Sequence, residues 1–506
     1  MILIVDFGSQ TTHLIGRKIR DLGIAVKICE PDDTLSEIKI NKPQGIIFSG
    51  GPSSVYEEGA PTIDQQVLET RIPILGICYG WQLIAQMLNG KVSSGSKEYG
   101  PALVEIKKNN SLLKPDKPFT VWMSHGDTVE RVPQGFDVVA SSQDVEAAFV
   151  ANDDKKIFGL QFHPEVQHTD FGFDILRNFA TKICDLKVKE KRLDVNQVIQ
   201  QVRDQLANTE SKIVAAVSGG VDSTVAAAIV GKAVGNRLVP IYCDNGLMRL
   251  GTKEQVQQIF ADHLKVQPKI IDCQDEFLQA LKGVTDPEQK RKIIGNLYIE
   301  IFDREAKKLD DVKFLVQGTI YSDVIESKGT KNSSKIKSHH NVGGLPEKMN
   351  LKLVEPLRKF YKDEVRELGK QLNLPEDTVK RQPFPGPGHA IRIIGEVTAK
   401  RLKKQQQADQ IVIEVLKDTG WFDKIFQSFP IMTGVDTTAV KGDERAYSEL
   451  VGLRIYDSKD IMTAGWSRLP YEVLQQISSR IVNEVPDVSR VAYDITTKPP
   501  ATMEWE

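Results

Sequence analysis

Short apolar runs alternate with amphipathic segments through about residue 320 of the chain. Seven runs are typical of buried strands that end in a turn: ILIVD (2–6), GIIFSGG (45–51), IPILGI (72–77), IVAAV (213–217), RLVPIYCD (237–244), KIIDC (269–273) and KFLVQG (313–318). Between runs, apolar residues recur at helical spacing, as Ile15, Ile19 and Leu22 do after the first run. Strands that alternate with helices predict parallel sheets covered on both faces.

Two interruptions divide the chain into three expected domains. The charged cluster KVKEKR (187–192) predicts a solvated linker or a helix start, and the proline- and glycine-rich RQPFPGPGHA (381–390) cannot continue a helix. After it we expect a strand over AIRIIG (390–395) and a long charged helix over about 396–417. The expected fold class is α/β, with two doubly wound, mostly parallel-sheet domains (1–186 and 187–381) followed by a smaller α+β domain (382–506).

Composition narrows the class of protein further. A net charge of −2 argues against a general nucleic-acid binder. The longest apolar runs have five or six residues, far short of the ~18 that cross a membrane. Asp6 interrupts the first apolar run too early for a signal peptide. Five cysteines, never in CxxC spacing, favour reduced thiols in a cytoplasmic protein.

Cys78 stands between a strand and a helix in ILGICYGWQLIA (74–85). A strand–nucleophile–helix turn exposes the side chain and directs it toward the positive end of the helix, which favours a thiolate. A thiolate nucleophile needs a base, and His163 in GLQFHPEV (159–166) is followed two positions later by Glu165. Together they predict a Cys-His-Glu triad. Taken alone, Cys78 would more often be a buried structural cysteine, and the turn and the HPE string together favour the nucleophile.

With FSGGPSSV (48–55), these motifs resemble the class I glutamine amidotransferases over about residues 1–185. The resemblance implies that Cys78 attacks the side-chain amide of glutamine and releases ammonia, with His163 as base and Glu165 as its partner. It also implies an oxyanion hole and glutamine contacts, for which the candidates are Gly51, Tyr79, Gln82, Ser124, His125 and Asp127.

The segment AVSGGVDST (216–224) is a glycine-rich turn between a strand run and a helix run. Gly219 and Gly220 allow backbone N–H groups to close on an anion, and the following helix adds its positive end. Asp222 is suited to hold Mg²⁺ against a phosphate. No Gly-Lys-Ser/Thr follows, so the loop is not the Walker type used for terminal phosphoryl transfer. A helix-capping turn is the alternative for this segment by itself.

The full string SGGVDS resembles the loop of the N-type ATP pyrophosphatases, which cleave ATP between the α- and β-phosphates. The resemblance implies Mg²⁺ at Asp222 and ATP contacts along the whole loop, at Ser218, Gly219, Gly220, Val221, Asp222, Ser223 and Thr224. Further strings extend the similarity to the glutamine-hydrolysing GMP synthetase family over essentially the whole chain: YCDNGLMR (242–249), KRKIIG (290–295), GTIYSDVIES (318–327), IKSHHNVGGLP (336–346) and KPPATMEWE (498–506). Gln382 and His389 depart from the family, where relatives often carry His and Leu.

This similarity implies three substrates, glutamine, ATP and xanthosine monophosphate (XMP), amination at the purine C2, and a homodimer built by the C-terminal domain. The run Lys290–Lys292 is expected to form a compact basic cluster that grips a phosphate. Candidate XMP contacts are Arg291, Lys498, Thr502 and Glu504. His339 and His340 lie in a polar stretch (327–351) that is expected to close as a lid over the adenylated intermediate.

Two other functions remain open from the sequence. One is another amidotransferase–pyrophosphatase pair, such as an NAD synthetase, whose usual amidohydrolase partner is of a different type. The other is a catalytically silent nucleotide sensor. Such a protein is expected to lose Cys78, His163 or Asp222, and all three are present.

Overall fold

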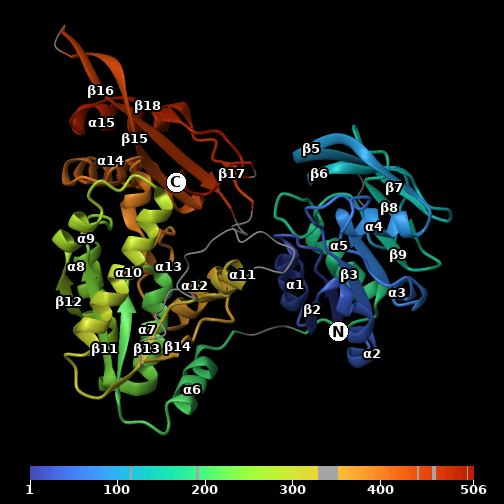
Figure 1. Ribbon diagram of the computed structural model, residues 1–506, viewed down its shortest axis with the longest axis horizontal. Coiled ribbons are helices and arrows are strands. Elements are labelled where there is room, and N and C mark those ends of the chain that lie inside the picture. Colours follow the sequence, from blue (N-terminus) through green and yellow to red (C-terminus); the bar gives the residue numbers. More distant parts are fainter. Residues whose placement is uncertain (114–116, 190–192, 329–350, 442–443, 459–462, 499) are drawn as a thin grey trace. The chain divides into compact units, whose positions relative to one another are not determined.

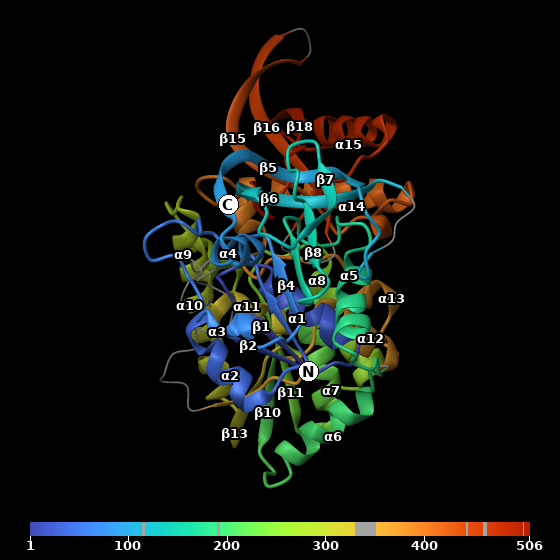
Figure 2. The ribbon, with the colours of Figure 1, turned by 90° about the vertical axis from the view of Figure 1, so that its right-hand side faces the viewer.

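A computed structural model of the chain describes residues 1–113, 117–189, 193–328, 351–441, 444–458, 463–498 and 500–506. The chain divides into two compact units, an N-terminal one up to residue 192 and a C-terminal one that contains most of the remainder (Figures 1 and 2). Among the described helices, none has both the length and the apolar character needed to cross a membrane.

A nine-stranded sheet organises the N-terminal unit. Five of its strands are parallel, in the order β2 (Val26–Cys29), β1 (Ile2–Val5), β3 (Gly45–Phe48), β4 (Ile74–Ile77) and β9 (Ile157–Leu160). The sheet continues with antiparallel strands β8 (Phe149–Asn152), β7 (Asp137–Ser142), β5 (Lys91–Ile106) and β6 (Phe119–Arg131). Strands β1, β3 and β4 match predicted runs, whereas β2, β9 and the antiparallel extension were not among them.

Strand β1 shows why these runs are apolar at every position. Ile2 and Ile4 belong to a core cluster on one side, and Leu3 and Val5 belong to a second cluster. Successive strand residues point to opposite faces, so a strand with helices on both faces needs no polar side. The helices of this unit are α1 (Thr12–Asp21), α2 (Thr34–Asn41), α3 (Gln66–Glu69), α4 (Tyr79–Met87) and α5 (Gly172–Asn178), with a short π-helix at Phe179–Ile183.

The C-terminal unit begins with a five-stranded, all-parallel sheet. Its order is β12 (Lys269–Asp272), β11 (Leu238–Asp244), β10 (Lys212–Val217), β13 (Val312–Val316) and β14 (Lys352–Val354). The helices of this part are α6 (Val195–Gln205), α7 (Val221–Val234), α8 (Thr252–Ile259), α9 (Gln274–Ala280), α10 (Pro287–Ala306), α11 (Tyr321–Lys328), α12 (Lys362–Gln371) and α13 (Glu376–Val379). These two parallel-rich sheets with helices confirm the predicted α/β class.

The end of the chain forms a small α+β layer. It comprises α14 (Ala399–Asp418), α15 (Tyr471–Glu484), a long antiparallel pair β15 (Gln427–Lys441) and β16 (Glu444–Asp457), and the short strands β17 (Gly465–Trp466) and β18 (Val488–Tyr493). One core cluster takes residues both from 243–301 and from 390–488, so this layer packs within the C-terminal unit. The division into three domains stays a prediction.

The strand expected at 390–395 is wrong. Residues Gly388–Arg392 form a 3₁₀ helix, and Ile393 makes a single isolated parallel bridge to Met432. Gly388 has a φ of +64°, and a side chain there would overlap the Leu247 carbonyl group, so the chain turns where a strand would continue straight. The expected charged helix after it is present as α14.

Gly159 provides a test of packing between β9 and α4. A Cβ atom at Gly159 would overlap the ring of Trp81, which is fully buried. We expect Gly159→Ala to destabilise the N-terminal unit by about 1–3 kcal/mol, because an overpacked core must shift side chains or backbone. Urea unfolding followed by Trp81 fluorescence measures this change. Gly126→Ala is the control, since only the Tyr99 hydroxyl lies near it, at 4.0 Å; equal midpoints for the two variants would contradict the prediction.

Candidate active sites

Cys78 occupies a strained turn between β4 and α4. Its φ of +51° and ψ of −109° lie outside the regions that residues with a side chain ordinarily adopt. The Cys78 N–H donates to the Leu160 carbonyl oxygen at 2.7 Å, which continues the parallel register of β4 on β9. His163 follows β9 by three residues, so this pairing brings the predicted nucleophile and base to the same sheet edge.

His163 and Glu165 form a buried pair. The His163 Nδ1 and a Glu165 oxygen are 2.7 Å apart, and the same oxygen accepts from the Thr11 hydroxyl at 2.5 Å. Burial by itself lowers the pKa of His163, but the charge of Glu165 and contacts with Cys78 and Glu165 outweigh it and hold this pKa well above its ordinary value. This shift favours the protonated form of the imidazole beside the sulfur.

Backbone and amide groups surround the Cys78 sulfur. The Gln161 Nε2 is 3.7 Å from Sγ, and Sγ is 3.6 Å from the Ser124 carbonyl oxygen. A Cβ added at Gly50 would lie 3.0 Å from the His163 ring, so only glycine allows this loop so close to the triad. Tyr79 opens α4, and the N–H groups of a first helical turn have no acceptor within the helix. Donors of this kind suit an oxyanion.

Two of the predicted glutamine contacts, Gln82 and Asp127, are bonded to each other. The Gln82 Nε2 donates to the Asp127 carbonyl oxygen at 2.8 Å, and an Asp127 carboxylate oxygen accepts from the Tyr56 hydroxyl at 2.9 Å. His125 lies 3.3 Å from Glu98, and burial lowers the pKa of His125 to about 4, so this imidazole is neutral. Their contact with glutamine stays a prediction.

The glycine-rich loop lies between β10 and α7, as expected for an anion cradle. Gly219 has a φ of +79°, and Gly220 is the residue that precedes the first turn of α7. The hydroxyls of Ser218 and Ser223 are 3.1 Å apart, and the Thr224 hydroxyl donates to the Gly220 carbonyl oxygen at 2.8 Å. These bonds fix the loop while the N–H groups that begin α7 stay available to an anion.

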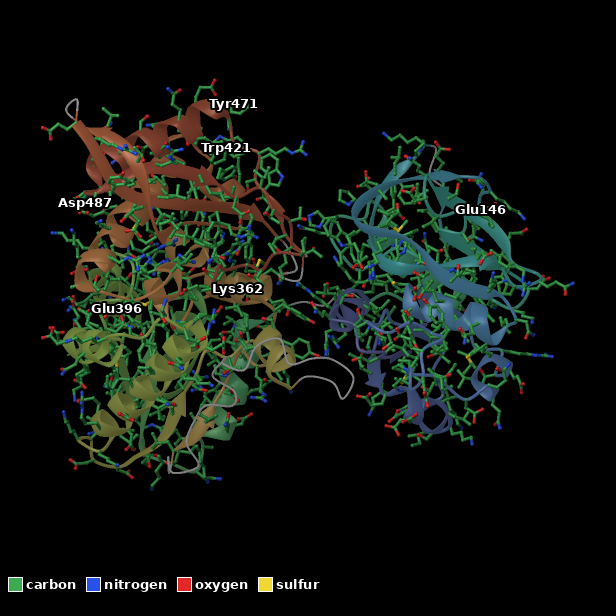
Figure 3. All side chains as sticks on the ribbon, turned by 45° about the horizontal axis from the view of Figure 1, so that its top comes forward. Glu146, Lys362, Glu396, Trp421, Tyr471 and Asp487 are labelled. Atoms are coloured by element: carbon green, nitrogen blue, oxygen red, sulfur yellow. The ribbon has the colours of Figure 1, made fainter. Side chains whose placement is uncertain are left out.

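Cations from distant segments complete this loop. The Lys362 Nζ, at the start of α12, is 2.6 Å from an oxygen of Asp222, and Arg381 donates to the Gly219 carbonyl oxygen (Figure 3 labels Lys362). Burial lowers the pKa of Arg366, one turn after Lys362, although the charge of Asp222 opposes this shift. The loop itself contains no lysine, but Lys362, 140 positions after Asp222, places its ammonium group beside the loop.

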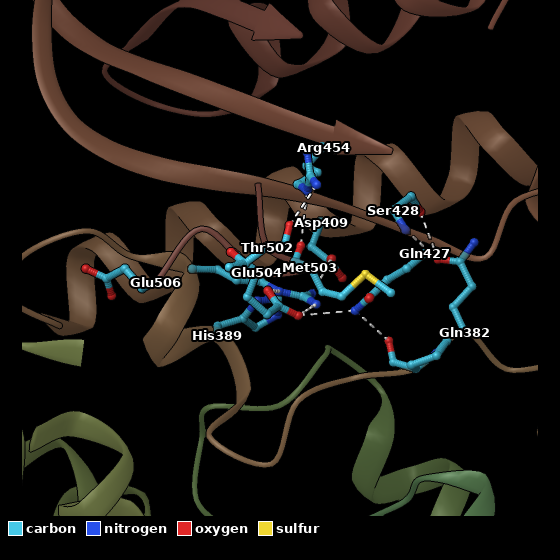
Figure 4. Close-up of polar contacts among 12 residues, drawn as sticks. Gln382, His389, Asp409, Gln427, Ser428, Arg454, Thr502, Met503, Glu504 and Glu506 are labelled. Atoms are coloured by element: carbon cyan, nitrogen blue, oxygen red, sulfur yellow. Dashed lines mark hydrogen bonds and ion pairs between the residues drawn. The ribbon is translucent and has the colours of Figure 1, made fainter. Parts of the chain in front are cut away.

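The C-terminal tail is bound by cations of its own chain (Figure 4). Glu504 accepts from the Nε and Nη2 of Arg392 at 3.0 and 2.9 Å, and the Thr502 carbonyl oxygen accepts from Arg454 at 2.7 Å. Arg291 donates to the main-chain oxygen of Glu506. The tail segment is thus fixed at three points.

The basic run at 290–292 differs from the expected cluster. Lys290 is fully buried and lies 2.6 Å from a side-chain oxygen of Glu506, whereas Lys292 is exposed. Burial lowers the pKa of Lys290 although its Glu506 partner opposes the shift. Because helical neighbours point in different directions, three consecutive cations do not form one phosphate grip. Arg291 remains a candidate contact for XMP. The main chain of Lys498 forms an isolated antiparallel bridge with Ala464.

The remaining predicted residues fall into two groups. His339 and His340 lie outside the described residues. Gln382 and His389 are buried, with a Gln382 oxygen accepting from the Ser428 N–H and hydroxyl at 3.0 and 2.9 Å. Burial lowers the pKa of His389 to about 3, which leaves it neutral. Within the described part of the chain, no group of three or more His, Cys, Asp or Glu residues is placed to hold a metal ion by itself.

Comparisons with known proteins agree with both halves of this arrangement. The class I glutamine amidotransferase model matches residues 3–183, and the GMP synthase C-terminal domain model matches residues 414–505. A protein of Campylobacter jejuni called GMP synthase [glutamine-hydrolyzing] is 50% identical over 100% of this chain and 99% of its own. Proteins of the same name from Aquifex aeolicus (50%, 99% of its length) and Lactobacillus acidophilus (49%, 98% of its length) also match the whole chain.

The chain belongs to the glutamine-hydrolysing GMP synthase family. This confirms the resemblance drawn from the motifs and, with it, the predicted enzyme class, a ligase.

The sequence analysis missed four residues near the two GMP synthase-family sites. Thr11 and Gln161 touch Glu165 and Cys78, and Lys362 and Arg381 touch the glycine-rich loop. Gln161 lies in GLQFHPEV, two positions before His163. Side chains two residues apart in an extended segment point to the same side, so the sequence could have placed Gln161 on the side of His163. The other three come from segments whose proximity only the fold creates.

Glu165→Gln tests the electrostatics of the triad. The amide keeps the shape but removes the charge, so burial dominates and we expect the pKa of His163 to fall from well above 6.5 to below it. A raised folded pKa stabilises the fold fully below about pH 6.5 and loses that contribution as pH rises through the folded value. NMR titration of the His163 ring measures both proteins. Glu98→Gln, beside His125, should leave the His163 midpoint unchanged, and an unchanged midpoint in Glu165→Gln would rule out this account.

Proposed function

We propose that this chain couples glutamine hydrolysis at Cys78 to ATP-dependent amination of XMP, with GMP, AMP, pyrophosphate and glutamate as products. The observation that carries the proposal is the presence, in one chain, of a strained cysteine beside a buried His–Glu pair and of an SGGVDS loop at a helix N-terminus. The names of the full-length relatives support the same pairing of activities.

The glutaminase step uses Cys78 with the adjacent His163–Glu165 pair. The Cys78 sulfur attacks the amide carbon of glutamine, and the imidazolium of His163 gives its proton to the departing nitrogen, which leaves as ammonia. Water then attacks the thioester while His163 accepts its proton, and glutamate leaves. The N–H groups of Gly51 and Tyr79 stabilise the oxyanion in both halves. Glu165 keeps the ring oriented throughout.

The glycine-rich loop is proposed to bind the β- and γ-phosphates of ATP through the N–H groups that begin α7. Lys362 supplies the cation that a Walker loop carries in its own sequence. A carboxylate with phosphate oxygens is a donor set that Mg²⁺ accepts, and the Asp222 Oδ1 is buried without a hydrogen-bond partner among the described residues. Asp222 would hold Mg²⁺, which supplies positive charge against the pyrophosphate that leaves.

Amination needs the C2 oxygen of XMP to become a leaving group. Attack of that oxygen on the α-phosphorus releases pyrophosphate and leaves AMP on the purine. Ammonia then attacks C2, AMP departs with the oxygen, and loss of a proton from the nitrogen gives GMP. Arg291 and Lys498 are proposed to face the phosphate of XMP, with Thr502 and Glu504 toward its purine.

A homodimer through the C-terminal layer is part of the proposal. The β15–β16 pair extends as a ribbon beyond the rest of this layer, and Val440 and Tyr447 on it are 75% and 65% exposed (Figure 1). Apolar side chains in such a position suit an interface between copies.

Two substitutions separate the two sites. We expect Cys78→Ser to abolish glutamine-dependent GMP formation and to leave ammonia-dependent formation intact, because free ammonia bypasses the thioester. We expect Lys362→Met to reduce both by at least about a hundredfold, since a cation on the phosphates is lost. Purine absorbance with XMP, ATP and Mg²⁺, plus either glutamine or an ammonium salt, gives both rates.

Lys370→Met is the matched control, because Lys370 lies on the same helix, is 62% exposed and forms an ion pair with Glu367 of that helix. Its rates should stay close to those of the unaltered chain. No GMP from XMP, ATP and ammonium in the unaltered chain would overturn the proposed function.

A further inference from the structure

Four charged side chains form a continuous line inside the C-terminal unit. The Arg249 Nε is 2.8 Å from one oxygen of Asp409, whose other oxygen is 3.9 Å from the Nη1 of Arg392. The remaining donors of Arg392 hold both oxygens of Glu504, at 2.9 and 3.0 Å. Two cations and two carboxylates alternate, so the line carries no net charge.

The centre of this line is fully removed from solvent. Arg392 is 0% exposed and Asp409 is 2% exposed. The Arg392 guanidinium lies 3.9 Å from the ring centre of Phe429, and the rings of Phe384 and Phe429 both face it. The pKa of Asp409 is held below its ordinary value: burial opposes ionisation, but the charges of Arg249 and Arg392 outweigh it. Ions buried this deeply are strongly destabilising unless each keeps its partner.

One end of the line reaches the glycine-rich loop. Arg249 accepts at its carbonyl oxygen from the Thr252 hydroxyl at 2.7 Å, and a Cβ added at Gly219 would lie 2.6 Å from the Thr252 methyl carbon. On the other side, the Gln406 Nε2 donates to the carbonyl oxygens of Gly246 and Met248, each at 2.9 Å. Helix α14 therefore holds the segment 246–249, which in turn packs on the loop proposed for ATP.

The other end of the line is the tail carboxylate proposed for the purine. Glu504 also accepts from the Gln427 Nε2 at 3.3 Å (Figure 4). A carboxylate offers about four acceptor positions, so Glu504 keeps acceptor capacity after these bonds. The fork of Arg392 fixes the plane of the carboxylate, because both oxygens bind one rigid guanidinium.

We propose that Asp409 and Arg392 are positioning residues that hold Glu504 in the orientation that accepts from the XMP purine, and that Arg249 anchors them to the segment beside the ATP loop. The inference rests on the proposed function, because it takes XMP as the ligand of Glu504. Neither Asp409 nor Arg392 touches a reacting atom. They affect the binding of XMP. This effect depends on Arg249, which lies next to the loop proposed for ATP.

Asp409→Asn is the primary test, measured as ammonia-dependent GMP formation by the full chain. The amide keeps the size but removes the charge that holds both arginines. We expect the KM for XMP to rise by about five- to 150-fold, the usual range of coupling between sites, with a much smaller change in kcat. A residue that only stabilises the fold would lower the melting temperature and the active fraction, and hence kcat, without changing KM.

Glu449→Gln is the matched control. Glu449 is a buried carboxylate that pairs with Arg401 of the same helix α14, at 2.7 Å, and it contacts neither the tail nor the segment 246–249 in the described structure. It should lose stability comparably and keep the KM for XMP. Equal KM values in Asp409→Asn and Glu449→Gln overturn the inference.

Arg249→Lys gives an independent result if Asp409→Asn does not fold. Lysine keeps the charge and loses the fork, so the KM for XMP should rise although Arg249 is remote from the tail. A double variant that combines Arg249→Lys with Glu504→Gln should lose less free energy of XMP binding than the sum of the losses in the two single variants, as expected for residues in one connected line. Additive effects, or an unchanged KM in Arg249→Lys, overturn the inference. If the unaltered chain forms no GMP, the proposed function itself is overturned. This result is distinct from an unchanged KM in the variants, which overturns only the positioning role.

Discussion

Parallel strand pairing is the constraint on which both candidate sites depend. In a parallel sheet the chain leaves every strand at the same edge, and residues that follow neighbouring strands meet there. Cys78 follows β4 and His163 follows its neighbour β9, so their proximity is a consequence of register. The SGGVDS loop follows β10, and the segment that contains Arg249 follows β11, the adjacent strand. The order of the strands in each sheet therefore decides which segments of the chain can contribute residues to each candidate site.

This constraint explains which features the sequence predicts well. Runs such as ILIVD and IVAAV are apolar at every position because they are covered on both faces, and such runs are visible without a structure. The cysteine turn, the HPE string and SGGVDS are local, so their residue types and spacing indicate the chemistry directly. The antiparallel strands β5–β8 escaped prediction. Buried and half-buried positions largely alternate along β6, so this strand resembles ordinary polar sequence, whereas β8 is buried throughout but has only four residues. Lys362 and Arg381 escaped it because their role arises from contacts across more than a hundred residues.

Buried charge accounts for the errors in the C-terminal part. Basic residues near a nucleotide-binding motif suggest ligand contacts, yet Lys290 is completely buried and binds Glu506 of the tail. A cation that is buried away from solvent needs an anionic partner within the protein, whether or not a ligand is bound. Sequence alone does not distinguish a cation that awaits a phosphate from one that holds the chain terminus.

The internal ion pairs of the tail also bear on the nucleotide binding proposed for it. A free terminal segment would lose conformational entropy when it closed on a ligand, at about 1–2 kcal/mol per residue for the backbone alone. Here Arg454 holds the main chain at Thr502 and Met503, and Arg392 holds the Glu504 side chain, so this ordering is part of folding. The ligand then meets groups already in place, and the interaction energy appears as affinity. The same argument makes the tail sensitive to substitutions deep in the core, because its order depends on cations that the ligand never contacts.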